Sequence, residues 1–274
     1  MPAADPVAST LAGFVSGLTP DHIPQEVSLR ARHLMLDAIG CGLAARREDF
    51  AVRFQDSLRS LAGGMQGKSG VAGFSERMAL RDATLLNGVL MHGLDYDDTH
   101  MAGVIHLTVS VLPAVLSLAA QRGASGSEML TAYIAAVEAG ARIASAVQGG
   151  FHQQGFHPTG LVGTFASALA AGRLMGLDAD ALVRAQGAAL SMASGNLQFI
   201  EDGAWTKRVH AGWAAKAGLT AAAFAAHGIV APQAPYTGRY GLYRSHLGEA
   251  GAARVDLALA TAGLDADGMR ASGS

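Results

Sequence analysis

Three aspartates stand within four residues in the segment NGVLMHGLDYDDTH, which runs from Asn87 to His100. On spacing alone, Asp95, Asp97 and Asp98 fit an acidic loop that faces water or caps the next helix. Carboxylate oxygens also suit a hard divalent cation, but no second acidic cluster completes a ligand set. A third interpretation has chemical content: one carboxylate faces inward beside Thr99, and the others hold the loop in place.

Histidines are frequent in the part of the chain that carries the fewest charges. The sequence has ten histidines, and six of them lie there: His92, His100, His106, His152, His157 and His210. A lone core histidine is usually structural, but several together suit proton transfer, because the ordinary imidazole pKa lies near neutrality. His157 directly precedes Pro158, a residue that favours the first turn of a helix. The positive end of that helix would favour the neutral imidazole.

The segment TKRVH, from Thr206 to His210, combines a cation with an imidazole. Lys207 and His210 would share one face of a helix. Spacing alone fits an ordinary surface lysine, and the alternative is a cationic group that binds a substrate carboxylate. We find no glycine-rich phosphate-binding motif, no HExxH and no GxSxG. The motifs of nucleotide, zincin and serine-hydrolase chemistry are therefore missing.

The composition excludes several classes of protein. Twenty Lys and Arg against 22 Asp and Glu give a formal net charge of -2, so no basic field attracts nucleic acid. The sequence has one cysteine, Cys41, which excludes an intrachain disulfide, a four-cysteine zinc site and an iron–sulfur cluster. Residues 101–121 and 143–172 carry no charge, but polar side chains interrupt both, so we interpret them as buried segments and expect no membrane partner. With no secretory signal in the first residues, we expect a cytoplasmic protein.

Apolar residues recur at helical spacing almost throughout, which predicts an all-α fold with a single bundle-like domain. We expect Asp5 to cap the first helix, with Pro6 at its first position. Further helices are predicted at about 24–44, 49–62, 75–92, 107–120, 128–148, 159–175, 178–194 and 204–227, with Ser75 and Ser127 as caps. Residues 63–74 are predicted to form a loop or a short strand pair, and the tail after Leu264 is expected to fray. Charged residues are only 15% of the sequence, against about 25% in an average soluble domain, which predicts a homodimer that covers apolar surface.

Four segments resemble the MmgE/PrpD family in order and spacing: NGVLMHGLDYDDTH, HLTVSVLPAVLSLAAQRGASGSEMLTAYIAAVE, FHPTGLVGTFASALAAGRLMGL and TKRVHAGWAAKAGLTAAAFAAHGI. The resemblance covers about residues 7–247. It implies a metal-free lyase or isomerase that acts on di- and tricarboxylic acids without a cofactor. The family includes 2-methylcitrate dehydratase, cis-aconitate decarboxylase and iminodisuccinate epimerase.

The resemblance also assigns candidate site residues. The active-site Asp and Thr of the D-[FY]-D-D-T motif fall on Asp95 and Thr99, the histidine of F-H-P on His157, and the lysine of T-K-x-x-H on Lys207. The next histidine of the family falls on His106, although the loop before it is one residue longer here. We expect Lys207 to anchor a carboxylate, His106 and His157 to move protons, Asp95 to orient one of them, and Thr99 to bind substrate, with His210 as a further substrate-binding candidate.

Family members are usually longer and add an α+β lid domain after the helical one. We therefore expect a helical domain over residues 1–248 and a divergent tail over 249–274, in a chain that is a fragment, a frameshifted product or half of a split protein. The expected function is a cofactor-independent lyase, first a hydro-lyase like 2-methylcitrate dehydratase, with weak activity without the lid. An epimerase or decarboxylase on a related acid stays open, and so does a non-catalytic helical domain that dimerises or binds an acid.

Overall fold

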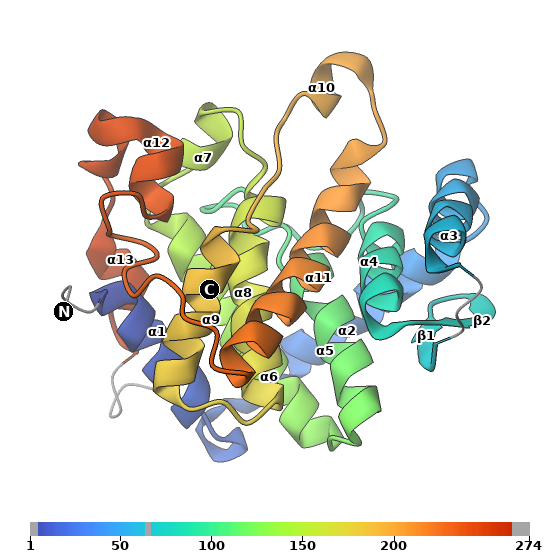
Figure 1. Ribbon diagram of the computed structural model, residues 1–274, viewed down its shortest axis with the longest axis horizontal. Helices are drawn as coiled ribbons and strands as arrows, with labels where there is room; N and C mark the ends of the chain where they lie inside the picture. The colour runs from blue at the N-terminus through green and yellow to red at the C-terminus, as the bar shows by residue number, and fades with distance from the viewer. Residues whose placement is uncertain (1–4, 64–66, 265–274) are drawn as a thin grey trace.

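The computed structural model describes residues 5–63 and 67–264, and within these ranges the regular structure is helical apart from one two-stranded hairpin (Figure 1). This confirms the predicted all-α class. The elements in chain order are α1 (Pro6–Gly17), η1 (Pro20–His22), α2 (Gln25–Ala45), α3 (Asp49–Ala62), β1 (Ser69–Val71), β2 (Phe74–Met78), α4 (Leu80–Met91), α5 (Thr108–Arg122), α6 (Gly126–Ser145), α7 (Gly150–Gln153), α8 (Pro158–Leu174), α9 (Ala179–Leu190), α10 (Phe199–Asp202), α11 (Thr206–Ala226), α12 (Leu242–Ala252) and α13 (Leu257–Thr261).

Helix α8 is the centre of the bundle. All its residues from Pro158 to Gly172 are buried, and it packs against α5, α6, α9 and α11. A helix that is apolar on every side must be covered on every side. Small residues let the covering helices come close: a Cβ atom added to Gly218 of α11 would lie 2.4 Å from the Cβ of Ser167.

Helices α4 and α11 touch through their backbones. A Cβ atom added to Gly88 would lie 2.4 Å from the Cα of Gly212, and one added to Gly212 would lie 2.1 Å from the carbonyl oxygen of Leu85. No side chain fits in so short a distance, so this pair of glycines sets the separation of the two helices. The contact brings the end of α4, where His92 lies, close to the first turns of α11.

The two ends of the described chain are anchored to the bundle. Asp5 caps α1 as predicted, accepting hydrogen bonds from the backbone of Val7 and Ala8. Its second oxygen accepts from the backbone of Tyr236 and Thr237, both at 2.8 Å. At the other end, the N–H of Asp256 donates to the carbonyl of Ala146 on the segment after α6 at 2.9 Å. The predicted boundary at residue 248 stays a prediction, and the tail predicted to fray lies outside the described residues.

Two helix starts predicted from serine caps are wrong. Ser75 lies in β2, which pairs antiparallel with β1, and α4 begins only at Leu80. The hairpin confirms the strand-pair alternative in the described part of residues 63–74, and it extends to Met78. Helix α6 is capped by Ser125 rather than Ser127, because Ser125 and Glu128 bond to each other's backbone in a capping box.

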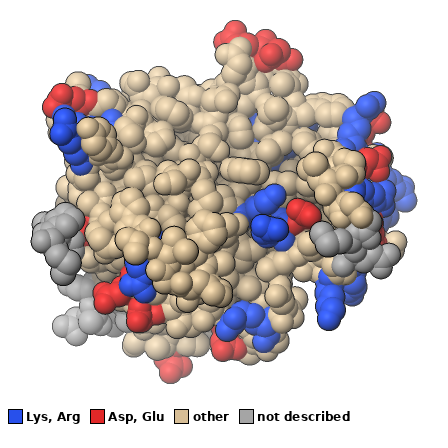
Figure 2. Space-filling view, in the orientation of Figure 1, with Lys and Arg blue, Asp and Glu red and all other residues tan. Residues whose placement is uncertain are grey.

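The described surface is poor in charge. Figure 2 shows one face on which uncharged residues dominate, with most charged side chains near its edges. Helix α2 exposes three leucines at intervals of seven residues, Leu29, Leu36 and Leu43, with exposed fractions of 52%, 69% and 45%. Such spacing places them on one face of the helix. Among the residues that the structure describes, no helix has both the length and the apolar character needed to span a membrane.

Candidate active site

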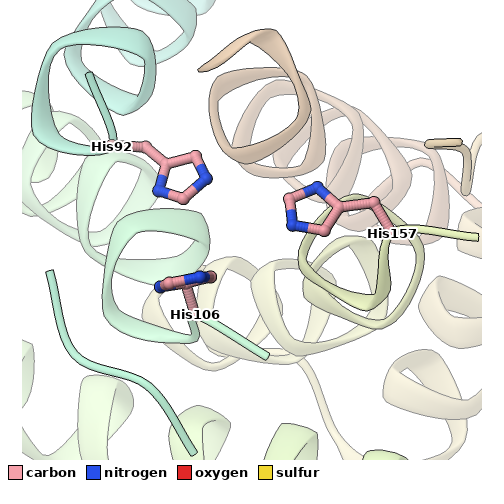
Figure 3. Close-up of side chains that lie close together, drawn as sticks. All are labelled: His92, His106 and His157. Atoms are coloured by element: carbon pink, nitrogen blue, oxygen red, sulfur yellow. The ribbon is translucent and has the colours of Figure 1, made fainter. Parts of the chain in front are cut away.

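The ends of four helices meet around a group of imidazole rings. His92 follows the last residue of α4, His106 stands just before α5, His157 is the N-cap of α8, and Lys207 and His210 lie in the first turns of α11. Ring centroids are 4.8 Å apart for His92 and His106, 5.9 Å for His92 and His157, and 5.1 Å for His157 and His210. Figure 3 shows the rings of His92, His106 and His157 around one common space.

Asp97 holds two of these rings. Both of its carboxylate oxygens lie 3.0 Å from Nδ1 of His92, and Oδ2 lies 3.1 Å from Nδ1 of His106. Burial alone would raise the pKa of Asp97, but the hydrogen bonds from His106 and His92 outweigh burial and hold that pKa well below its ordinary range. The carboxylate is therefore charged and accepts from the Nδ1 side of both rings, so their Nε2 atoms remain for other partners.

His106 is the ring best placed to carry a proton. Burial disfavours its charged form, but the hydrogen bond to Asp97 outweighs burial and raises the pKa of His106. The carbonyl oxygen of Asp98 lies 3.1 Å from the same Nδ1, and Oγ1 of Thr99 lies 3.4 Å from it. The backbone N–H of His106 donates to Oγ1 of Thr159 at 3.1 Å, which fixes the loop to α8. The charged imidazolium is thus more stable at His106 than at an unperturbed histidine.

His157 has the opposite character. It is 4% exposed. Burial, followed by the nearby rings of His92, His210 and His106, lowers the pKa of His157 to about 2. Burial also lowers the pKa of His210, to about 4. The two Nδ1 atoms lie 2.9 Å apart, so one donates and the other accepts, and the two neutral rings have opposite tautomers.

Asp95 forms an ion pair with Lys207 at the open side of the cluster. Oδ1 of Asp95 accepts a hydrogen bond from Nζ of Lys207, and the Nε2 atom of His106 lies 3.9 Å away. Burial raises the pKa of Asp95, but Lys207 lowers it more, so the net shift is downward. The φ angle of Asp95 is +61°, a strained backbone region for a residue with a side chain, and such strain is concentrated at functional sites.

The predicted site residues Asp95, His106, His157, Lys207 and His210 come together in the structure, and Thr99 stands at the edge of the group. Their roles stay predictions. Two members of the cluster, His92 and Asp97, were not among the predicted residues. Asp97 is the carboxylate of the DYDD segment that bonds to the imidazoles, while Asp95 pairs with Lys207. The five-residue interval between His92 and Asp97 could have predicted their contact, because a side chain at the end of a helix can bond to a side chain in the turn that follows.

Histidine nitrogens and carboxylate oxygens are also common metal ligands, so the cluster can be compared with a metal site. Two groups have potential ligand atoms within 4.8 Å of one another: His92, His106 and His157, and His92, Asp95, Asp97 and His106. Tetrahedral zinc with bonds of about 2.0–2.1 Å to nitrogen needs ligand atoms ~3.4 Å apart. The ammonium of Lys207 adds positive charge beside Asp95, which opposes a cation. The cluster therefore combines potential metal ligands with the hydrogen-bonded imidazoles that proton transfer needs.

A cavity of about 630 Å³ borders the same loop, between α2 and α6. Asp98, Thr99 and His100 line it on the loop side, and Arg30 and Tyr133 on the helix side. Burial raises the pKa of Asp98, in contrast to its neighbour Asp97. Of the predicted site residues, Thr99 alone lines this cavity, so the cavity and the imidazole cluster are different places that share one loop.

Comparison with known proteins identifies the family of the chain. The chain matches the MmgE/PrpD N-terminal domain over residues 9–255. It is 30% identical over 243 residues to a cis-aconitate decarboxylase-like protein of Aspergillus oryzae, covering 86% of this chain and 50% of that protein. It is 31% identical over 241 residues to cis-aconitate decarboxylase of Aspergillus terreus, a match that covers 86% of this chain and 49% of that protein. It is 30% identical over 233 residues to human cis-aconitate decarboxylase, a match that covers 81% of this chain and 47% of that protein. The chain thus spans about half the length of the curated relatives it matches, and it belongs to the MmgE/PrpD family.

Proposed function

We propose that this chain carries the acid–base groups of a cofactor-independent lyase for a di- or tricarboxylic acid. The observation that carries the proposal is the meeting of Lys207 with four imidazoles where α5, α8 and α11 begin. Helix N-termini favour anions, and Lys207 supplies a full positive charge. A substrate with several carboxylates suits this place, because each of its charges meets a cation or a positive helix end.

The proposed roles follow from the electrostatics of each group. Lys207 exchanges its bond to Asp95 for a bond to a substrate carboxylate, since its side chain is 23% exposed. His106, with a raised pKa, donates a proton, and neutral His157 accepts one. Thr99 stands within 3.4 Å of His106 and bonds to a substrate oxygen. Asp97 keeps His92 and His106 in fixed orientations, whereas Asp95 was predicted to orient His106 or His157.

Decarboxylation of cis-aconitate is the first reaction to test, because the relatives carry that name. When the bond to CO₂ breaks, its electron pair stays on the substrate carbon, and that carbanion must gain a proton. In this proposal a histidine of the cluster, His106 or His157, supplies that proton. Dehydration of 2-methylcitrate is the second candidate. One group must remove a carbon-bound proton while another protonates the leaving hydroxyl, and the contrast in pKa between His157 and His106 fits that division.

The test is turnover of cis-aconitate and 2-methylcitrate, followed by NMR of the products. The chain is assayed alone and also fused to the C-terminal half of the Aspergillus terreus relative. We expect Lys207→Ala to raise KM and lower kcat, and His157→Ala to lower kcat by about 10²-fold or more. Lys216→Ala is the matched control, because Lys216 lies on the same helix with a similar exposed fraction, 26%.

Two results would contradict the proposal. One is no product from either acid with either form of the protein. The other is equal activity of Lys207→Ala and Lys216→Ala. Binding of a tricarboxylate without any turnover would favour the non-catalytic, acid-binding alternative.

A further inference from the structure

The bond between His157 and His210 raises a problem that the proposed function does not solve. A neutral imidazole that accepts a proton at Nε2 becomes a cation unless it loses its other proton. His157 is buried and faces His92 from α4, His106 before α5, and both Lys207 and His210 from α11. Burial and these neighbours together lower its pKa to about 2. A cation at His157 is therefore strongly disfavoured, and a base that cannot hold its proton needs a route by which to pass charge on.

We infer that His210 is a proton relay for His157, through the Nδ1–Nδ1 hydrogen bond of 2.9 Å. This inference rests on the proposed function and adds a role to the same site. The substrate C–H bond breaks, its electron pair stays on carbon, and Nε2 of His157 takes the proton. The proton already on Nδ1 of His157 crosses to Nδ1 of His210. His210 then releases the proton on its Nε2 to water, and both rings end neutral.

The same chain of bonds works in reverse. When Nε2 of His157 gives its proton to a substrate carbanion, Nδ1 receives one from His210, and water restores His210. A neutral imidazole is a very weak acid by itself, because its anion is strongly basic. Simultaneous transfer at Nδ1 avoids that anion. The relay therefore lets a buried ring serve as a base or as an acid without charge remaining on it.

The position of His210 suits the outer end of such a relay. Its pKa, lowered to about 4, is less depressed than that of His157. His210 is partly exposed, whereas His157 is buried. A charge therefore costs less on His210 than on His157, so the transfer runs outward.

Close backbone packing surrounds this pair of rings. A Cβ atom added to Gly160 would lie 2.3 Å from the carbonyl oxygen of Ser194 and 3.1 Å from the Cβ of His210. The backbone N–H of His157 donates to the carbonyl of Gly195 at 3.2 Å. Phe199 covers both rings, with centroids 5.5 Å from His157 and 5.8 Å from His210. Backbone and aromatic contacts thus fix the positions of the two rings that share the Nδ1–Nδ1 hydrogen bond.

The experiment replaces His210 by a group that keeps the bond but cannot pass a proton. In His210→Asn the amide can still bond to Nδ1 of His157. We expect kcat to fall by about 10²-fold with little change in KM. In His210→Ala, imidazole added to the buffer should restore part of kcat in a concentration-dependent way. His227→Asn, an exposed histidine at the end of the same helix, should keep wild-type kcat.

A second measurement reads the relay without turnover. Nitrogen NMR of histidine-labelled protein at pH 7 should show one protonated and one unprotonated Nδ1, coupled across their hydrogen bond. A doubly protonated ring at either position would overturn the relay, and so would His210→Asn with wild-type kcat and pH profile. Failure of the proposed function is a different result, namely no turnover of any acid by the wild-type chain or its fusion.

Discussion

Replacement of Asp97 by asparagine tests whether one buried carboxylate holds the site together. The carboxylate accepts from Nδ1 of both His92 and His106, and the side chains of Asp97 and His92 are fully buried. In Asp97→Asn the charge is lost and an NH₂ group replaces one oxygen, so the NH₂ faces Nδ1 of His92, donor against donor in the tautomer that the carboxylate favours. Leaving a buried charge partner unpaired costs about 3–5 kcal/mol. We expect the free energy of unfolding to fall by about that amount, and kcat to fall by about 10²- to 10⁴-fold as His106 loses its orientation.

The pH dependence has a definite sign. The folded-state pKa of Asp97 is lowered. Its contribution to the free energy of unfolding is therefore present above the unfolded-state pKa of about 3.9, and it is lost as the pH falls toward the folded-state pKa. The folded-state pKa of His106 is raised. Its contribution is therefore complete below about 6.5 and is lost as the pH rises through the folded value. The difference in stability between wild type and Asp97→Asn should peak between about pH 4 and 6.5.

Urea unfolding followed by circular dichroism at pH 3, 5.5 and 8 measures this difference. The control is Asp56→Asn, since Asp56 is 61% exposed and pairs with Arg59 on the surface at 3.0 Å. Exposed pairs contribute at most about 1 kcal/mol. The account of this carboxylate would be wrong if Asp97→Asn lowered the free energy of unfolding no more than Asp56→Asn does at pH 5.5. It would also be wrong if the stability of Asp97→Asn varied with pH as that of the wild type does.

Three other predictions concern metal, assembly and packing. Exhaustive chelation should leave any turnover unchanged, and loss of turnover restored by one divalent metal would mean that the cluster was misinterpreted. The exposed leucines of α2 predict a homodimer, so Leu36→Glu should shift light scattering toward the monomer mass, and a wild-type monomer at micromolar concentration would contradict this. Gly212→Ala should force α11 away from Leu85 and reduce stability by about 1–3 kcal/mol or more, whereas Gly13→Ala, with nothing within 4 Å, should be neutral or stabilising by up to about 1 kcal/mol. Equal unfolding midpoints for the two variants would refute the packing argument.

Periodicity and caps predicted most of the helices, because both are local. The predicted third helix, residues 49–62, agrees with α3 at both ends. Asp178 caps α9 by accepting from the N–H of Ala181 at 2.8 Å. The choice between Ser125 and Ser127 was readable as well, since Ser125 alone stands three residues before Glu128 in the S-x-x-E pattern. The strand at Ser75 was harder to predict. A serine before a helical pattern also suggests an N-cap, and the alternating pattern of so short a strand is weak.

The site was only partly readable, because it depends on contacts between distant segments. Residue types and their spacing in the sequence identified His157 and Lys207 as candidates, and both lie where a helix begins. They did not reveal that Asp97 rather than Asp95 bonds to Nδ1 of His92 and His106, because the sequence does not show which way each carboxylate of the turn faces. They also did not single out His92, whose place depends on the backbone contact between α4 and α11.

Proton exchange at substrate carbon tests the central claim most directly. The chain, alone and as the fusion, is incubated with cis-aconitate or 2-methylcitrate in D₂O, and deuterium at carbon is followed by NMR. We predict protein-dependent deuterium in the product or the recovered acid, lost in His157→Gln and in Lys207→Ala and retained in Lys216→Ala. Binding of either acid with no deuterium at carbon, unaffected by Lys207→Ala, would contradict the claim that this cluster moves protons to and from a bound carboxylic acid.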